Sequence, residues 1–265
     1  MNESTVLLHQ ADGIATLTFN RPSQLNAMNR EMMESIIATL DAVNQDAESR
    51  VLVITGEGRA FMAGADIKEY ACQTREAFES FQVLGRRVYD AIEGLSKPVI
   101  AAINGYAFGG GLEIALACDM LVAAEGAKMG LPEILLHLIP GGGGTQRLPK
   151  KLGHGYANEL LMSGRTATAE EFLERGLLNR IFPVEGFAEA VRDFATPFAD
   201  KDPEALRVLK QLSRLACGPV NSAAQCLENE TLARLYRAEP AQTKLREFLE
   251  ASLERERRKA EGACP

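Results

Sequence analysis

The sequence has few of the residues that bind metals or form disulfides. Only three histidines occur and no H-E-x-x-H pattern is present, so we expect no histidine-centred metal site. The five cysteines are odd in number and scattered, and none belongs to a C-x-x-C pair. This pattern argues against a disulfide framework and a zinc site, and it predicts a reducing, cytoplasmic environment.

Basic charge and long apolar runs are also scarce. The formal net charge is -7 and the isoelectric point is near 5.2, so most of the surface should repel a phosphate backbone. No apolar run approaches the roughly 20 residues that span a bilayer. The start, "MNESTVLLHQADG", lacks the basic and apolar regions of a signal peptide. We therefore expect neither a nucleic-acid partner nor membrane insertion, and an anionic small molecule would need a local cationic patch.

Strand-like and helical patterns alternate along most of the chain. Amphipathic periodicity predicts helices over 29–44 and 76–95. Such alternation is typical of α/β proteins with a largely parallel sheet. The runs that predict strands, rich in β-branched residues, are "STVLLHQ", "GIATLTFN", "RVLVITG", "KPVIAAING", "DMLVAAEGAKMG" and the shorter "NRIFP".

The strand signals stop after about Pro197, and helical signals continue to the end. We predict an α/β core over 1–196 and a helical segment over 197–265. The last stretch, "REFLEASLERERRKAEG", reads as a charged helix, and a solvated helix end explains its cations, which are favourable near the C-terminal dipole. Contact with an anionic ligand is the other interpretation of these basic residues, which are Arg255, Arg257, Arg258 and Lys259.

Capping residues locate two of the helices. Thr168 and Glu171 form a T-x-x-E pattern that predicts a capping box, and Gly176 is expected to end the helix that they start. Asp202 and Pro203 predict the cap and first residue of a later helix.

Three segments place small residues where a strand leads into a helix: "RAFMAGADIKEY", "GYAFGGGLEIALACD" and "LPEILLHLIPGGGGTQRL". Glycine and alanine allow another group to approach the backbone, and a helix start offers unpaired N–H groups, so these turns suit an oxyanion or a phosphate. None of them matches G-x-G-x-x-G or G-x-x-x-x-G-K-[ST], so a dinucleotide fold or P-loop is not supported. Tight turns and close helix packing are the alternative explanation of the glycines.

Two glutamates lie at the starts of otherwise apolar elements. Glu113 is flanked by apolar residues, and Glu133 follows Pro132 ahead of "ILLHLIP". The helix dipole alone favours an acid at such a position by roughly 0.3–1 kcal/mol. Burial, however, raises a carboxyl pKa and suits the group to acid–base chemistry near neutral pH. Two such groups could divide one proton-transfer reaction between them.

Several long motifs, in this order and spacing, resemble the crotonase (enoyl-CoA hydratase/isomerase) superfamily. They are "IATLTFNRPSQLNAMN", "VLVITGEGRAFMAGADIKEY", "KPVIAAINGYAFGGGLEIALACD", "LPEILLHLIPGGGGTQRL" and "SGRTATAEEFLERGLLNRIFP". The resemblance implies an α/β fold, a spiral of ββα units, with a C-terminal helical segment used in trimerisation and a homotrimer or a hexamer made of two trimers. It also implies an acyl-CoA thioester as the ligand.

The resemblance assigns roles to four residues. The backbone N–H groups of Ala65 and Gly110 would bind the thioester oxygen. Glu113 and Glu133 correspond to a catalytic pair that holds one water over C3 of a trans-2-enoyl thioester. We assign Glu113 to the water and Glu133 to proton delivery at C2, with sharing of the protons between them as the alternative.

The resemblance also implies where the CoA and acyl parts would lie. Coenzyme A would lie along residues 59–68, with Ala63, Ala65, Asp66 and Ile67 near the pantetheine and adenine and Lys68 near the phosphates. Leu25 is a further expected CoA contact. Ser23 stands where many members have a phosphate-contacting lysine, which the C-terminal basic residues could replace, from the same or a neighbouring subunit. His137 replaces a usually small residue, and the sequence assigns it no function. The acyl pocket is expected at Tyr70, Phe78, Phe81 and Leu84.

The leading hypothesis is hydration of short to medium trans-2-enoyl-CoA, without a cofactor beyond the CoA of the substrate. A specialised hydratase, dehydratase or isomerase acting on a branched, polar or aromatic acyl-CoA is the second hypothesis, since Glu133 alone could move a proton between C2 and C4. A non-catalytic acyl-CoA-binding or scaffold protein is the third. Without a dinucleotide motif, any later oxidation needs a separate dehydrogenase partner.

Overall fold

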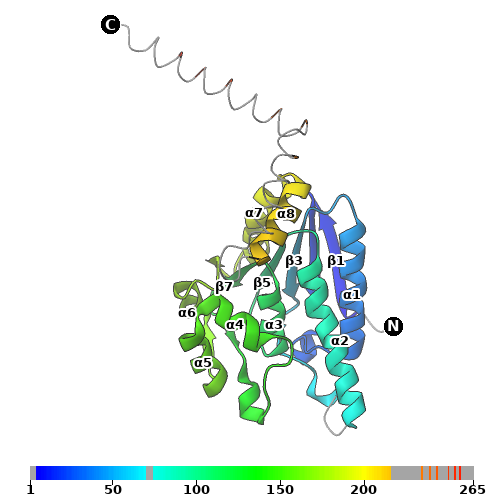
Figure 1. Ribbon diagram of the computed structural model, residues 1–265, viewed down its shortest axis with the longest axis vertical. Helices are drawn as coiled ribbons and strands as arrows, with labels where there is room; N and C mark the ends of the chain where they lie inside the picture. The colour runs from blue at the N-terminus through cyan, green and yellow to red at the C-terminus, as the bar shows by residue number, and fades with distance from the viewer. Residues whose placement is uncertain are drawn as a thin grey trace. The chain divides into compact units, whose positions relative to one another are not determined.

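The computed structural model describes residues 4–69 and 74–215, together with six single positions further on. It divides into two compact units, residues 1–201 and 202–265. Figure 1 shows the larger unit as two sheets flanked by helices. The single positions are Arg234, Glu239, Thr243, Glu250, Glu254 and Arg257.

The larger sheet confirms the predicted parallel architecture. Its six strands have the order β1-β2-β3-β5-β7-β10, and all neighbours are parallel except β1 and β2, which form an antiparallel pair. All six predicted runs contribute to it. The strands are β1 (Val6–Ala11), β2 (Ile14–Phe19), β3 (Val51–Gly56), β5 (Val99–Ile103), β7 (Met120–Ala124) and β10 (Arg180–Phe182).

A second sheet is built from four strands of three residues each, in the order β4-β6-β8-β9. The first three are parallel to one another, and β9 is antiparallel. The predicted run 119–130 is in fact two strands, β7 and β8, one in each sheet. The short strands are β4 (Ala60–Met62), β6 (Tyr106–Phe108), β8 (Lys128–Gly130) and β9 (Thr166–Thr168).

The order of elements produces a spiral. A strand of the large sheet is followed by a strand of the small sheet and then by a helix, three times over: β3-β4-α2, β5-β6-α3 and β7-β8 with a 3-10 turn and α4. The helical elements are η1 (Pro22–Gln24), α1 (Arg30–Gln45), η2 (Ile67–Glu69), α2 (Arg75–Gly94), α3 (Gly110–Ala117), η3 (Pro132–Leu136), α4 (Gly144–Leu152), α5 (His154–Ser163), α6 (Ala169–Glu174), α7 (Phe187–Ala199) and α8 (Pro203–Leu215).

Both faces of the large sheet are buried. Leu52 and Ile54 face the core formed with α1, α2 and α3, whereas Val51 and Val53 face α7. Alternate residues of a strand point to opposite faces, so a sheet covered on both sides needs a continuous apolar run, as "RVLVITG" has. α3 is buried along its whole length, which makes it the central helix of this unit.

The helix predictions are largely confirmed. Asn29 and Thr74 cap α1 and α2 by accepting hydrogen bonds from Met32 N–H and Ala77 N–H. Likewise, Asp202 accepts a hydrogen bond at 2.8 Å from a main-chain N–H in the first turn of α8.

The capping box at α6 forms only by half. Thr168 Oγ1 accepts a hydrogen bond from Glu171 N–H at 3.3 Å, but the Glu171 carboxylate pairs with Arg165 instead of reaching back to the cap. Gly176, with φ +78°, follows the helix as predicted. The Glu171 carboxylate therefore binds the guanidinium of Arg165 and not the N–H of the cap residue, since a charge-assisted pair is the stronger interaction.

The predicted boundary between the core and the helical segment falls within a helix. α7 runs through positions 196 and 197, and the two compact units divide between Lys201 and Asp202. The trimerisation role of the C-terminal segment stays a prediction, because most of that segment lies outside the described residues. So do Tyr70 and, of the C-terminal cations, Arg255, Arg258 and Lys259.

Asn26 joins the turn after β2 to the segment that leads into β4. It is fully buried in the left-handed conformation (φ +57°), and its Oδ1 accepts a hydrogen bond from Arg21 N–H at 2.8 Å. Its Nδ2 donates to the carbonyl oxygens of Glu57, at 3.0 Å, and Ala60, at 2.7 Å. Asparagine suits this position because it tolerates positive φ and offers both a donor and an acceptor.

We expect Asn26→Ala to lower the free energy of unfolding by about 2–4 kcal/mol, since it leaves buried main-chain groups unpaired at a strained position. Chemical denaturation measures this. Asn29→Ala, which removes an N-cap from α1, is the matched control with an expected loss of about 1 kcal/mol. An equal or smaller loss for Asn26→Ala would contradict this structural role.

Candidate active site

The three small-residue segments meet at one edge of the small sheet. Ala63–Ala65 follows β4, Gly109 follows β6, and Leu131 follows β8. Because β4, β6 and β8 are neighbouring parallel strands, their carboxyl ends lie side by side. Ligands of α/β proteins bind outside the carboxyl ends of the strands, so this edge is the candidate site.

Glu113 lies in the first turn of α3 and is 2% exposed. Its Oε1 accepts hydrogen bonds from the N–H groups of Gly142 and Gly144, both at 2.8 Å. Burial raises the pKa of this carboxyl, while these two bonds and the charge of Arg147 oppose the rise. The glycine-rich loop before α4 therefore holds the Glu113 carboxylate in a fixed orientation.

Glu133 is the second residue of η3, directly after Pro132. Its Oε1 lies next to Gly109, where an added Cβ would be only 3.1 Å away. Its Oε2 is buried and has no hydrogen-bond partner among the residues that the structure describes. Burial, with a contribution from the charge of Glu113, raises the pKa of Glu133 to about 7. The predicted carboxyl pair therefore exists, and one member is poised near neutral pH.

The backbone of Ala65 lies beside the backbone of Gly110. A Cβ added to Gly110 would lie 3.7 Å from the Ala65 nitrogen. The bridge that anchors this segment uses the Gly64 carbonyl and the Asp66 N–H, and so does not engage the Ala65 N–H. Gly110 is the first residue of α3, where N–H groups have no partner within the helix. Two N–H donors are thus grouped next to the carboxyl pair.

Each of the three glycines before Glu113 is explained by a different feature of the structure. Gly109 has φ +52° and ψ −124°, which other residues rarely adopt. Gly110 leaves room for a group between its own N–H and that of Ala65. Gly111 packs directly on β4, where an added Cβ would lie 2.0 Å from the Met62 carbonyl oxygen. The turn-and-packing explanation of the glycines therefore holds for Gly109 and Gly111, and at Gly110 an added Cβ would lie 3.1 Å from the Tyr89 hydroxyl oxygen.

Of the residues expected to bind CoA, Ala63 and Asp66 stand on either side of Gly64 and Ala65, Ile67 and Lys68 begin η2, and Leu25 is the C-terminal cap of η1. Ala63 N–H donates to the Leu25 carbonyl oxygen at 3.0 Å, and Lys68 N–H donates to Asp66 Oδ1 at 3.2 Å. Ile67 is 49% exposed. Asp66 forms an ion pair with Arg21, Nη2 to Oδ2 at 3.0 Å, which sequence reasoning missed because the two residues are far apart in the chain.

Residues expected at the acyl pocket are divided. Phe81 and Leu84 are buried on α2 and Phe78 is half-buried, whereas Tyr70 lies outside the described residues. His137 is the C-terminal cap of η3, in the left-handed conformation with φ +57°. The position of His137 thus has a structural explanation that its side-chain chemistry did not suggest.

Sequence reasoning also missed Tyr89 and Arg147, which lie beside the carboxyl pair. The Arg147 guanidinium donates to the Gly142 carbonyl oxygen, pairs with Glu93 at 2.7 Å, and lies 5.9 Å from the centre of the Tyr89 ring. Tyr89 belongs to an apolar helical pattern, which indicates packing, and Arg147 to a basic one, which indicates solvation. Neither pattern marks its residue as part of a functional site.

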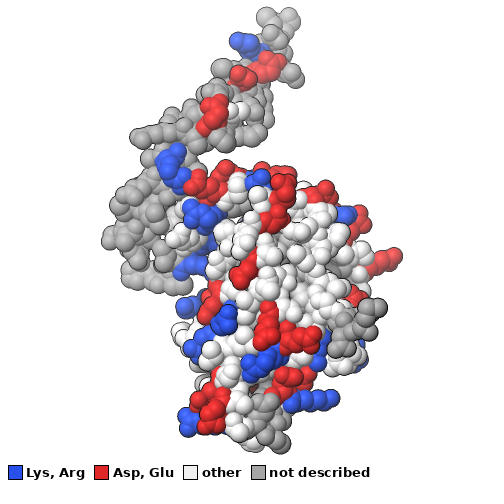
Figure 2. All heavy atoms as spheres, turned by 90° about the vertical axis from the view of Figure 1, so that its right-hand side faces the viewer, with Lys and Arg blue, Asp and Glu red and all other residues white. Residues whose placement is uncertain are grey.

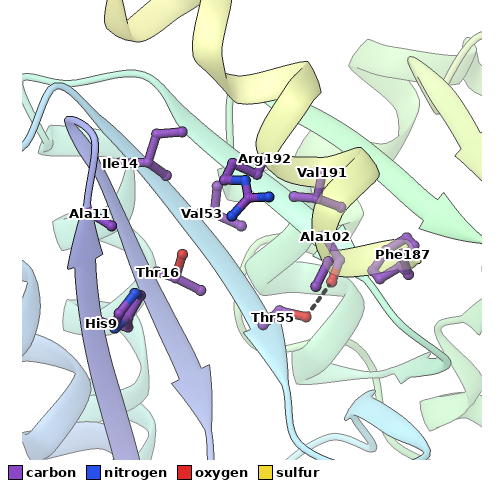
Figure 3. Close-up of a pocket in the computed structure, with 11 residues that line it drawn as sticks. His9, Ala11, Ile14, Thr16, Val53, Thr55, Ala102, Phe187, Val191 and Arg192 are labelled. Carbon is purple, nitrogen blue, oxygen red and sulfur yellow. Dashed lines mark hydrogen bonds between the residues drawn. The ribbon is translucent and has the colours of Figure 1, made fainter. Parts of the chain in front are cut away.

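A separate pocket lies between the large sheet and α7 (Figure 3). His9, Thr16 and Arg192 line it together with apolar side chains, and Thr55 donates a hydrogen bond to Ala102. Its lining contains no carboxylate and none of the residues predicted for the site. Within the described ranges, no group of three or more metal-binding side chains is present either. The two buried carboxyls of raised pKa, Glu113 and Glu133, thus lie at the edge of the small sheet and not in this pocket.

Comparison with known proteins agrees with this geometry. Residues 9–259 match the model of the family described as enoyl-CoA hydratase/isomerase. The chain belongs to this family. Among solved structures, an enoyl-CoA hydratase from Bacillus anthracis superposes with a TM-score of 0.89 at 35% identity, covering 93% of this chain and 96% of that one. The fold is therefore the crotonase fold that the sequence motifs predicted.

Curated relatives cover nearly the whole chain. A short-chain-enoyl-CoA hydratase of Clostridium acetobutylicum is 33% identical over 99% of this chain and 98% of its own. A 2,3-dehydroadipyl-CoA hydratase of Escherichia coli is 34% identical over 93% of this chain and 96% of its own. The chain thus matches enzymes of this family along its full length.

The raised pKa of Glu133 predicts a cost in stability above neutral pH. The folded state favours the protonated Glu133, whose pKa is about 7 there and 4.5 in the unfolded chain. The free energy of unfolding therefore falls as pH rises from about 4.5, and the loss is complete above about 7. Glu133→Gln should therefore melt at a higher temperature than wild type at pH 8, and the difference should vanish near pH 4. Glu170→Gln, which removes an exposed carboxyl of lowered pKa, is the control and should show no gain. Equal melting of Glu133→Gln and wild type at pH 8 would contradict the assignment.

Proposed function

We propose that this protein is an enoyl-CoA hydratase, adding water across the 2,3 double bond of a trans-2-enoyl-CoA to give a 3-hydroxyacyl-CoA. The pair of buried carboxyls with raised pKa, next to two grouped backbone N–H donors, carries the proposal. The family relationship and the names of the relatives support it. A third relative, 35% identical, is a crotonyl-CoA hydratase of Syntrophomonas wolfei.

In the proposed mechanism the N–H groups of Ala65 and Gly110 bind the thioester oxygen. As water attacks C3, the electrons of the double bond shift toward C1, and negative charge develops on that oxygen. Donors already oriented toward the charge stabilise it, and losing one in acyl-transfer systems costs about 3 kcal/mol of activation free energy. α3 adds the partial positive charge of its N-terminus at the same place.

The two glutamates divide the protons of one water molecule. Glu113, whose carboxyl the N–H groups of Gly142 and Gly144 hold in place, accepts a hydrogen bond from the water and orients it toward C3. Glu133, with its pKa near 7, supplies the proton that bonds to C2. The water oxygen bonds to C3, its released proton passes to the carboxyl pair, and the pair returns to its initial charge. This addition requires no redox cofactor, because no electrons are transferred.

For the CoA moiety we propose contacts with Leu25, Ala63, Asp66, Ile67 and Lys68. Lys68 and Ile67 are both exposed and lie beside Ala65, so the first offers a cation to a phosphate and the second an apolar surface. On the face drawn in Figure 2, Lys and Arg side chains of the larger unit stand among Asp and Glu side chains and wide uncharged areas.

A specialised hydratase for a polar, branched or aromatic acyl group remains the second candidate. The relative that is named for 2,3-dehydroadipyl-CoA favours it. A non-catalytic acyl-CoA-binding or scaffold role is disfavoured, because a binding role alone would not keep Glu133 at a cost in stability. A cytoplasmic location and a separate dehydrogenase that oxidises the product remain predictions.

We further propose that the chain forms a homotrimer or a dimer of trimers. A run of apolar side chains from η3 to the following turn is exposed in the single chain, and a second copy would remove it from water. Its members are Ile134, Leu135, Leu136, Leu138 and Ile139, which are 39–74% exposed.

The described helices include none that is long and apolar enough to cross a bilayer.

Loss of the ultraviolet absorbance of crotonyl-CoA tests the hydratase activity. Wild type should remove the conjugated enoyl thioester rapidly, and Glu133→Gln and Glu113→Gln should each lower kcat by about 10²-fold or more, because each removes a proton-transfer group. Binding of the thioester should persist in both variants. Wild-type rates in both would refute the site, whereas an inactive wild type that still binds the thioester would favour the specialised substrate.

The pH dependence of kcat/KM follows from the required protonation states. Glu133 must carry a proton, so the rate should fall above an apparent pKa near 7. Glu113 must be ionised, so the rate should also fall in acid, as that carboxyl, whose pKa is raised, takes up its proton. Because the two carboxyls interact, the two apparent values belong to the pair. A rate that rises through pH 7 would show instead that Glu133 acts as a base.

A further inference from the structure

Tyr89 of α2 brings a phenol group to the edge of the proposed oxyanion site. The side chain is 5% exposed, and the Arg147 guanidinium lies 5.9 Å from the centre of its ring. A phenol at this place can donate a hydrogen bond to a bound molecule.

The position of the hydroxyl is set by two glycines. A Cβ added to Gly110 would lie 3.1 Å from Tyr89 Oη and 3.7 Å from the Ala65 nitrogen. The space beside Gly110 is therefore bordered by three donors: its own N–H, the N–H of Ala65 and the phenol of Tyr89. A Cβ added to Gly142 would lie 2.3 Å from the Tyr89 ring and 2.6 Å from Oη, so the ring occupies the place of a side chain at that position.

The charges around Tyr89 keep its proton in place. Burial raises the pKa of the phenol well above its ordinary value, and the charges of Glu113 and Glu133 raise it further, against the opposing effect of Arg147. The phenol is therefore a hydrogen-bond donor throughout the pH range in which the carboxyl pair works. Arg147 lies over the ring and, through Gly142, fixes the loop against which the ring packs.

We propose that Tyr89 is a third oxyanion donor, whose hydroxyl donates a hydrogen bond to the thioester oxygen as negative charge develops on it. This role rests on the proposed hydratase function and adds a catalytic residue to it. The donor is preorganised by packing against Gly142, so it costs little reorganisation when the charge appears. An interaction that strengthens in the transition state changes kcat more than KM.

Steady-state kinetics of Tyr89→Phe on crotonyl-CoA is the first test, because this change removes the hydroxyl and keeps the ring. We expect kcat to fall by about 10- to 100-fold with KM changed less than threefold. Tyr156→Phe is the matched control: it removes a phenol that donates to Glu171, away from the carboxyl pair, and should leave kcat unchanged. Unchanged kcat in Tyr89→Phe would overturn the proposal.

Exchange of the C2 protons of butyryl-CoA in D₂O separates an effect on the thioester oxygen from an effect on the attacking water. This saturated thioester cannot be hydrated, yet its exchange passes through the same enolate. Tyr89→Phe should slow exchange by the same factor as hydration. Slower hydration with a wild-type exchange rate would overturn the proposal, because it would assign the phenol to the water. Equal losses of hydration and exchange would also overturn it if Tyr89→Phe melted below the assay temperature.

The absorbance of bound cinnamoyl-CoA gives a readout that does not depend on turnover. Donors on the thioester oxygen polarise the conjugated system, so wild type should shift the absorbance to longer wavelength and Tyr89→Phe should reduce that shift. An equal shift in both would overturn the role of Tyr89 and leave the hydratase function standing. A wild type that neither hydrates crotonyl-CoA nor exchanges butyryl-CoA would overturn both.

Discussion

Parallel pairing of three very short strands is the constraint on which the site depends. β4, β6 and β8 contain three residues each, and their carboxyl ends carry Ala65, Gly110 and Glu133. The pairing continues past the strands, because Gly109 N–H donates to the Gly130 carbonyl oxygen at 2.9 Å. Segments that are far apart in the chain thus present two N–H donors and a carboxyl at one edge.

The burial of α3 follows from this arrangement and determines the chemistry of Glu113. A helix that is apolar all round suits a central position, and Gly111 lets it lie directly on β4. An ionised carboxyl in such a place needs donors, which the loop before α4 supplies through Gly142 and Gly144. Glu133 receives no comparable support for Oε2, so its pKa rises to about 7. Unequal hydrogen bonding thus gives two identical side chains different electrostatic environments.

Packing around the site links its parts. Arg147 connects Glu93 of α2 to the glycine loop, and the Tyr89 ring fills the space that Gly142 leaves. On the other side, the Asn26 side chain ties the turn before α1 to the approach to β4, and the Arg21–Asp66 pair holds the segment after Ala65. The backbone donors and the carboxyl pair are therefore positioned by side chains from several other elements.

The sequence by itself determined the strands of the large sheet, the main helices, the family and the four residues of the proposed mechanism. It could do so because apolar periodicity and long motifs are local signals, as at α1 and in "AFGGGLEIALACD". It missed β4, β6 and β9 as strands, because three residues are too few to show a period. Only the tertiary structure brought Tyr89, Arg147 and Asn26 to the segments around the candidate site, since each contacts neighbours distant in the chain. It also decided which carboxyl is poised near neutral pH, because a pKa depends on burial and hydrogen-bond partners that fold together.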